Sequence, residues 1–139
     1  MKTRLTLILV LLIYIGAASH THAQQKKVIK TMMIAGQDGS HYWQGAREAM
    51  KQILENSGMF KVDFAFTPDF GGDIATFKPD FHQYDLIVIN YGGATWTEPV
   101  RKNFEKYVAD GGGVVVIHSS VVPMADWKEY NEIIGMGAW

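Results

Sequence analysis

The sequence of 139 residues contains no cysteine. This absence excludes a disulfide framework, and it excludes anchoring through a lipidated cysteine. Basic residues are also few, because 13 Lys and Arg stand against 14 Asp and Glu and no basic stripe is present. Since proteins that bind nucleic acid need clustered cations to neutralise phosphates, we expect no nucleic-acid partner.

Long hydrophobic segments are missing as well, apart from one near the N-terminus. Residues 5–18 are apolar with a single exception and follow a basic start. This run is shorter than the roughly 20 residues of a membrane-spanning helix. With the small residues Thr21 and Ala23 behind it, the pattern predicts a signal peptide over residues 1–23. We therefore expect a secreted or periplasmic protein, with residues 24–139 as one domain. We expect no stable membrane insertion after cleavage of the signal peptide. An uncleaved N-terminal anchor is the alternative.

The pattern of apolar residues predicts an α/β fold. The runs at residues 86–89 and 114–117 are continuously apolar, which is typical of strands buried on both faces of a parallel sheet. Residues 28–35 predict a first strand, and the alternation at residues 60–66 predicts a half-exposed edge strand. Helical periodicity fills the connections before the second and fourth strands. Right-handed crossovers then predict a sheet of order 2-1-3-4.

Local signals define the two helices. Ser40 or Asp38 is the expected N-cap of the first helix, and the spacing of Thr95 and Glu98 predicts a capping box at the second. Apolar residues recur at three- and four-residue spacing and predict the buried faces. They are Trp43, Ala46, Met50, Ile53 and Leu54 in the first helix, and Val100, Phe104, Tyr107 and Val108 in the second.

The predicted strand order places residues 114–117 at the far edge of the sheet. Natural proteins usually protect an exposed edge with charge or proline, and this strand has neither. We therefore expect the chain to be the N-terminal part of a larger domain, whose next strand covers this edge. A homodimer partner in the same position is the alternative.

The same order brings the loops that follow three strands to one edge of the sheet, where open α/β sheets bind ligands. His118 directly follows the fourth strand, and a histidine can serve as general acid or base near neutral pH. His41 and Asp38 lie in the loop after the first strand. We interpret these three as candidate catalytic residues. Each has an alternative role. His118 could hold its loop in place, His41 could face solvent in a first helical turn, and Asp38 could cap the helix.

Other chemistries have weaker support in the sequence. Two histidines and a carboxylate are suitable ligands for zinc or iron, but their spacing is not that of a metal motif, so we expect no metal and no cofactor. Ser119 is not expected to be a nucleophile, because no Gly-x-Ser-x-Gly turn surrounds it. His82 precedes a strand and is expected on the surface at the opposite edge.

Aromatic and polar residues in or just after the converging loops indicate a small-molecule carbohydrate partner. Apolar faces of sugars stack on aromatic rings, and their hydroxyls need oriented polar partners. Core packing is the alternative for Tyr91 and Trp127. The candidate substrate-binding residues are Asn90, Tyr91, Trp96, Ser119 and Trp127.

Several segments in this order resemble the ThuA-like (trehalose utilisation) family. They are residues 36–43 (GQDGSHYW), 84–93 (YDLIVINYGG), 104–113 (FEKYVADGGG), 116–119 (VIHS) and 127–135 (WKEYNEIIG), together with Trp96. The similarity runs from about Lys30 to Trp139. It implies a flavodoxin-like layered fold with a mostly parallel sheet, similar to class I glutamine amidotransferases. It also implies that the family domain continues through a second histidine-containing region beyond this chain.

The resemblance implies a role in sugar utilisation, in bacteria often beside oxidoreductases that make 3-keto sugars. Amidotransferases carry a nucleophilic cysteine after the strand that His118 follows here, so the absence of cysteine excludes thiolate glutaminase chemistry. The leading hypothesis is an exported enzyme that acts on a glycoside or a keto sugar by hydrolysis, elimination or isomerisation. The alternatives are a non-catalytic carbohydrate-binding module and a partner domain.

Overall fold

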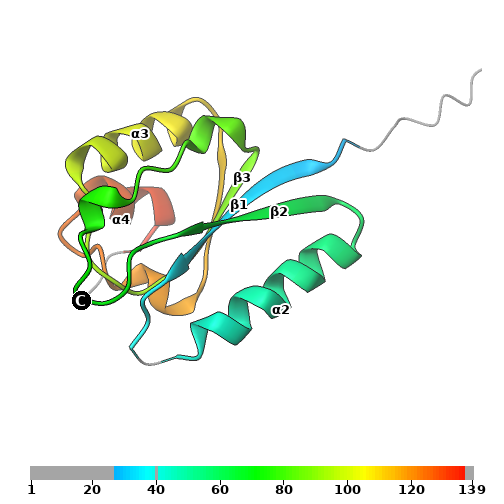
Figure 1. Ribbon diagram of the computed structural model, residues 1–139. Coiled ribbons are helices and arrows are strands. Elements are labelled where there is room, and N and C mark those ends of the chain that lie inside the picture. The colour runs from blue at the N-terminus through cyan, green and yellow to red at the C-terminus, as the bar shows by residue number, and fades with distance from the viewer. Residues whose placement is uncertain (1–26, 40, 137–139) are drawn as a thin grey trace, which may run out of the picture.

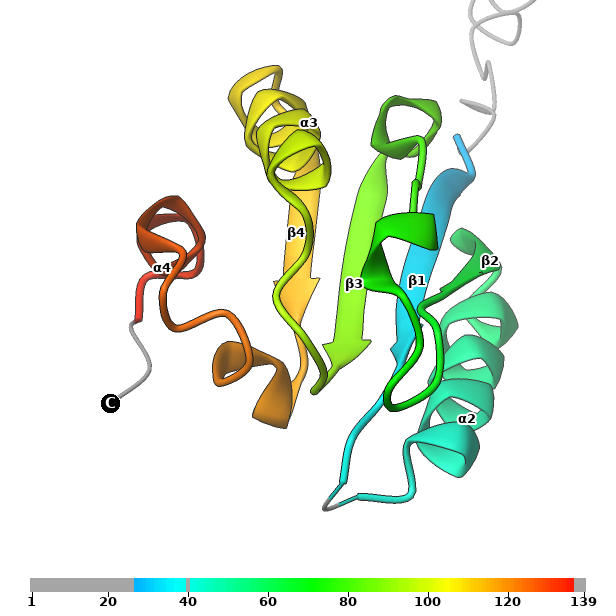
Figure 2. The same ribbon diagram turned by 60° about the vertical axis from the view of Figure 1, so that its left-hand side comes forward.

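The computed structural model describes residues 27–39 and 41–136. The predicted signal peptide, residues 1–23, lies outside the described residues, as does Ser40. Four strands form one parallel sheet in the order β2-β1-β3-β4, as predicted (Figures 1 and 2). The strands are β1 (Ile29–Gly36), β2 (Phe60–Phe66), β3 (Leu86–Tyr91) and β4 (Gly113–Val116).

Helices cover both faces of this sheet. Figure 2 shows α2 (Trp43–Asn56) on one side, with α3 (Glu98–Ala109) and α4 (Lys128–Ile134) on the other. The connections also contain three short 3-10 helices: η2 (Ile74–Thr76), η3 (Phe81–Gln83) and η4 (His118–Val121). The α/β layered fold that the sequence predicts is therefore confirmed. No helix within the described ranges is long and apolar enough to cross a membrane.

The two faces of the sheet are covered to different extents. On the side of α3 and α4 lies the main core, in which the aromatic rings of Trp96, Phe104, Trp127 and Tyr130 contact one another. On the side of α2 lies a smaller cluster of buried residues, made of Met33, Val62 and Val88. The sequence predicts the buried face of α3 correctly, since Val100, Phe104 and Tyr107 are buried there.

The predicted buried face of α2 is partly wrong. No residue of this helix is buried, and Ile53 is 70% exposed. Met50 and Leu54 pack against the small cluster beneath the helix, whereas Ala46 faces solvent. The helix is the only one on its side of the sheet within the described residues, so only one narrow stripe of it finds a partner.

Both cap predictions are also wrong. Tyr42 is the N-cap of α2 and makes no capping bond through its side chain, so neither Asp38 nor Ser40 is the N-cap residue. Thr97 is the N-cap of α3, again without a side-chain bond. Thr95 lies too far from that helix to close a capping box. Its hydroxyl donates instead to Asp126 Oδ1 at 3.1 Å, which ties the loop after β3 to the segment before α4.

Candidate functional site

Three loops meet at the carboxyl edge of the sheet, as the predicted topology requires. The loops after β1 and β3 are joined by a hydrogen bond from the Gly92 amide to the Gln37 carbonyl, at 2.7 Å. The loops after β1 and β4 are joined by the Ser119 hydroxyl, which donates to Asp38 Oδ2 at 2.5 Å. Segments far apart in the sequence therefore form one polar cluster.

His118 has a strained backbone conformation in this cluster. It is the first residue of η4, and its φ is 42°, the only positive value of a non-glycine residue in the described part of the chain. A left-handed conformation costs an L-residue about 1–2 kcal/mol. Such strain persists where the surroundings impose it and is frequent at active sites. His118 follows Ile117, whose backbone is still extended, and begins the turn of the chain into η4.

The two candidate histidines lie against each other. The ring centroids of His41 and His118 are 4.7 Å apart, with the ring planes inclined at 37°. Both residues are exposed, so a substrate could reach either ring. This contact joins the segment before α2 to the segment after β4. The structure thus brings together the residues that the sequence proposes as catalytic.

Asp38 and Ser119 form the neighbouring pair of this cluster. Asp38 is half-buried, and its carboxylate accepts the hydroxyl proton of Ser119. A serine hydroxyl directed at a carboxylate oxygen is suited to holding a ligand hydroxyl, as the sequence analysis expects for Ser119. Asp38 holds the loop after β4 in place, which is a different structural role from the predicted cap.

Sequence reasoning missed Gln37, which organises the loops around the cluster. Its side chain is 94% buried, and its Nε2 donates to the Pro68 carbonyl in the loop after β2. Its own carbonyl accepts from Gly92. A Cβ on Gly92 would lie 3.0 Å from that carbonyl oxygen, so glycine is needed here for close approach of two loops, rather than for a tight turn. Gln37 could not be found from the sequence, because a single buried polar residue in a loop is not part of any periodic pattern.

Ser120 is the second positioning residue that the sequence does not reveal. It is fully buried, its Oγ accepts from the Tyr91 amide at 2.8 Å, and its carbonyl accepts from the Tyr130 hydroxyl at 2.9 Å. These bonds fix η4 between β3 and α4. The position of His118 and Ser119 therefore depends on a buried neighbour.

The proposed binding residues occupy two environments. Asn90 and Tyr91 end β3 at the edge of the cluster, but both are buried. The Nδ2 of Asn90 has no hydrogen-bond partner among the described residues. The Tyr91 hydroxyl donates to the Ala94 carbonyl at 2.7 Å, and burial raises the pKa of Tyr91 to about 12. Tyr91 is thus held as a neutral donor to the backbone.

Trp96 and Trp127 lie in the main core, each only 1% exposed. Their ring centroids are 6.0 Å apart, and the Trp127 Nε1 donates to Glu105 Oε1 at 2.9 Å. Neither ring presents a face to solvent, so neither offers a stacking surface to a sugar in this structure. For Trp127 this is the core-packing alternative considered in the sequence analysis.

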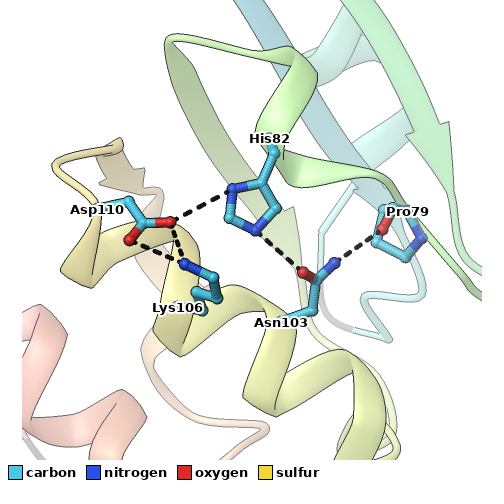
Figure 3. A network of polar contacts seen from close by, with 5 residues as sticks. All are labelled: Pro79, His82, Asn103, Lys106 and Asp110. Carbon is cyan, nitrogen blue, oxygen red and sulfur yellow. Dashed lines mark hydrogen bonds and ion pairs between the residues drawn. The ribbon is translucent and has the colours of Figure 1, made fainter.

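His82 lies at the opposite edge of the sheet, as expected. Figure 3 shows its ring between two partners, with Nε2 3.1 Å from Asn103 Oδ1 and Nδ1 3.8 Å from Asp110 Oδ2. Lys106 also binds Asp110, and this hydrogen bond lowers the pKa of the Asp110 carboxyl. The network connects η3 with α3 and has a structural role. Within residues 27–39 and 41–136, no group of three or more His, Asp or Glu side chains is arranged to hold a metal ion.

Comparisons with known proteins agree with this architecture. The model of the ThuA family, described as trehalose utilisation, matches residues 12–139. The crystal structure of a ThuA-like protein from Parabacteroides merdae is 44% identical in sequence and superposes with a TM-score of 0.77. That match covers 81% of this chain but only 40% of the other protein, so the chain corresponds to less than half of that protein's length. No curated protein matches the sequence.

Proposed function

Since the chain belongs to the ThuA family of trehalose utilisation, we propose that it acts on a carbohydrate, either a glycoside or a keto sugar. The family and the similar ThuA-like structure support a role in carbohydrate utilisation. The reaction itself is our proposal: a hydrolysis, an elimination or an isomerisation in which the cluster at the carboxyl edge transfers protons.

The observation that supports this proposal best is the conformation of His118. An exposed histidine in a left-handed backbone, with a second histidine ring 4.7 Å away, is an arrangement with no evident benefit to stability. The hydrophobic core that stabilises the fold does not include His118. His118 also follows the carboxyl end of a parallel strand, and α/β folds bind their ligands at these strand ends.

Each of the three reactions needs a group that takes a proton from carbon or oxygen and returns it to another atom. An imidazole performs both steps near neutral pH, and in our proposal His118 is this group. His41 would share or relay the proton across the ring contact. Asp38 and Ser119 would hold a sugar hydroxyl, because one is an acceptor and the other both donates and accepts.

A non-catalytic carbohydrate-binding module is the second candidate. The observation that favours it is the exposure of both histidine rings, because enzymes usually exclude water from the reacting groups. The two candidates share the ligand and differ in turnover.

The test is an assay of the full chain with trehalose and with 3-keto-trehalose, monitored by sugar analysis and by calorimetric titration. Conversion of either compound supports the enzyme. Binding without conversion supports the binding module and rejects the enzyme. If neither compound is bound or converted, the carbohydrate proposal is wrong and a partner domain is favoured.

We also propose that the protein is exported to the periplasm or secreted. The support is the sequence pattern of residues 1–23, a basic start, an apolar run and small residues before Gln24. N-terminal sequencing of the protein from its native cell would find Gln24 first if the signal peptide is cleaved there. A chain that retains Met1 and stays in the cytoplasm would reject this proposal.

A further inference from the structure

An open pocket of about 470 Å³ lies beside the histidine pair. It is formed by the loop between β1 and α2, by the first turn of α2 and by the loop after β2. Its lining residues include Asp38 and His41 from the loop after β1, and Asp69 and Phe70 from the loop after β2. Tyr42, Trp43 and Gln44 line it as well. The pocket is therefore continuous with the proposed reacting groups but extends well beyond them.

Two aromatic rings in this pocket are unusually exposed. Tyr42 is 78% exposed and Phe70 is 64% exposed, although an aromatic ring normally gains by burial. Each ring lies next to a glycine. A Cβ on Gly45 would collide with the Tyr42 ring, so this glycine leaves the space for the ring over the first turn of α2. The tip of the Phe70 ring lies next to Gly39, 3.9 Å from the position of a Cβ.

We propose that this pocket is a binding subsite for a neutral sugar unit, with Tyr42 and Phe70 as stacking rings. This inference rests on the proposed function, because it takes a carbohydrate as the ligand. It adds the place where one sugar unit binds and the absence of charge on that unit. Exposed aromatic faces beside carboxylates and amides are what the apolar face and the hydroxyls of a sugar require. His41 belongs to both the pocket and the histidine pair, so a sugar stacked here has its next bond near His118.

The charges around the pocket disfavour an anionic ligand. Asp38 and Asp69 line it, and no lysine or arginine is among its described lining residues. Two carboxylates in a pocket repel a phosphate or a carboxylate on the ligand, because like charges at short range are unfavourable even near the surface. Polar contacts remain available for hydroxyl groups, for example from the Gln44 amide. A neutral sugar therefore fits, and a sugar phosphate does not.

The test is calorimetric titration of the full chain with trehalose and with trehalose 6-phosphate. We expect trehalose to bind, and to bind more tightly than its phosphate. Tyr42→Ala and Phe70→Ala each weaken trehalose binding by about tenfold, the loss expected for one stacking ring. Asp69→Asn reduces the difference in affinity between trehalose and trehalose 6-phosphate. Ile53→Ala is the matched control, because Ile53 is equally exposed on the same helix but outside the pocket, and it leaves binding unchanged.

The outcomes separate this inference from the proposed function. Trehalose binding or turnover that is unaffected in the two ring variants overturns the subsite and leaves the function intact. Binding that depends on both rings, without conversion of trehalose or 3-keto-trehalose, supports the subsite and rejects the enzyme. Tighter binding of the phosphate overturns the neutral-sugar assignment, and no binding of either ligand overturns both. Thermal melting of each variant shows that it is folded, which is expected because the two rings are exposed.

Discussion

At the scale of single residues, His118 shows most clearly that function and stability differ in what they require. Its φ of 42° is unfavourable for most residues with a Cβ, and glycine would adopt it freely. A chain shaped by stability alone would place glycine or asparagine here. The imidazole that stands there instead is the main reason for treating this position as functional.

Backbone strain at His118 predicts an unusual order of stability. His118→Gly and His118→Ala both remove the ring, but only glycine removes the Cβ that makes the left-handed conformation costly. We expect His118→Gly to be more stable than His118→Ala by roughly 1 kcal/mol. Urea unfolding of both variants measures the difference. Equal stabilities, or a more stable alanine variant, would show that the backbone at this position is not strained.

Burial of Tyr91 predicts loss of stability in alkali. The unfolded chain releases the Tyr91 proton near pH 10, whereas the folded chain keeps it until about pH 12, because burial raises the pKa. The folded state then binds more protons than the unfolded state, so the free energy of unfolding falls as the pH rises from about 10 to 12. In Tyr91→Phe this fall is smaller. At pH 7 the variant loses only the bond to Ala94, about 1 kcal/mol. Identical pH dependence of unfolding in the two proteins would contradict this account.

At the scale of elements, the site depends on how loops and short helices are held together. η4 is four residues long and has little stability of its own. Its position comes from Ser120, which binds the β3 backbone and accepts from α4, while the adjacent Ser119 reaches across to Asp38. One serine therefore supports the structure, and its neighbour belongs to the site.

The two serines predict opposite mutational effects. Ser120→Ala leaves the buried Tyr91 amide without its acceptor, which costs about 1–3 kcal/mol in the free energy of unfolding. Ser119→Ala costs less than about 1 kcal/mol, because its hydroxyl lies in a partly open site, but it weakens sugar binding. Denaturant unfolding and calorimetric titration of both variants measure the two effects. The reverse ranking in stability would show that Ser120 does not position η4.

The sequence predicts the elements better than their ends. The continuous apolar runs of β3 and β4 and the alternation of β2 are strong local signals, and they predict the strands and their order correctly. The expected burial of β4 on both faces is not found among the described residues, since none of Gly113–Val116 is buried. The caps at Asp38 and Thr95 are wrong because a capping residue is recognised by type and spacing, whereas both side chains have better partners across the fold. Such partners, like those of Gln37, arise only when distant loops meet.

At the scale of the whole molecule, the sheet is unevenly covered. β4 pairs only with β3, and α2 alone lies on its side of the sheet within the described residues. Val115 on β4 is 43% exposed, and Val122 just beyond is 56% exposed. The strand order predicts this edge position, and the apolar run of β4 is the reason to expect a covering strand or partner there. The sequence does not predict the site's aromatic pocket, because exposed rings and buried rings look alike in a sequence.

The homodimer alternative predicts self-association through β4, whose outer edge has no partner strand among the described residues. An apolar edge strand with free backbone donors and acceptors pairs readily with another chain, and a lysine on such an edge prevents pairing. We expect sedimentation velocity to find dimers whose fraction rises with concentration. Val115→Lys would be folded and monomeric. A wild-type chain that stays monomeric, or a variant that dimerises equally, would exclude β4 as the interface.

The central claim is that His118 is the acid–base group of a carbohydrate-processing site. The most direct test is the turnover of trehalose and 3-keto-trehalose by the wild-type chain and by His118→Gly, with folding of the variant verified by thermal melting. Glycine keeps the backbone conformation and removes only the imidazole. The account predicts conversion by the wild type and a loss of at least about 100-fold in kcat in the variant. Equal kcat in a folded His118→Gly variant would contradict it.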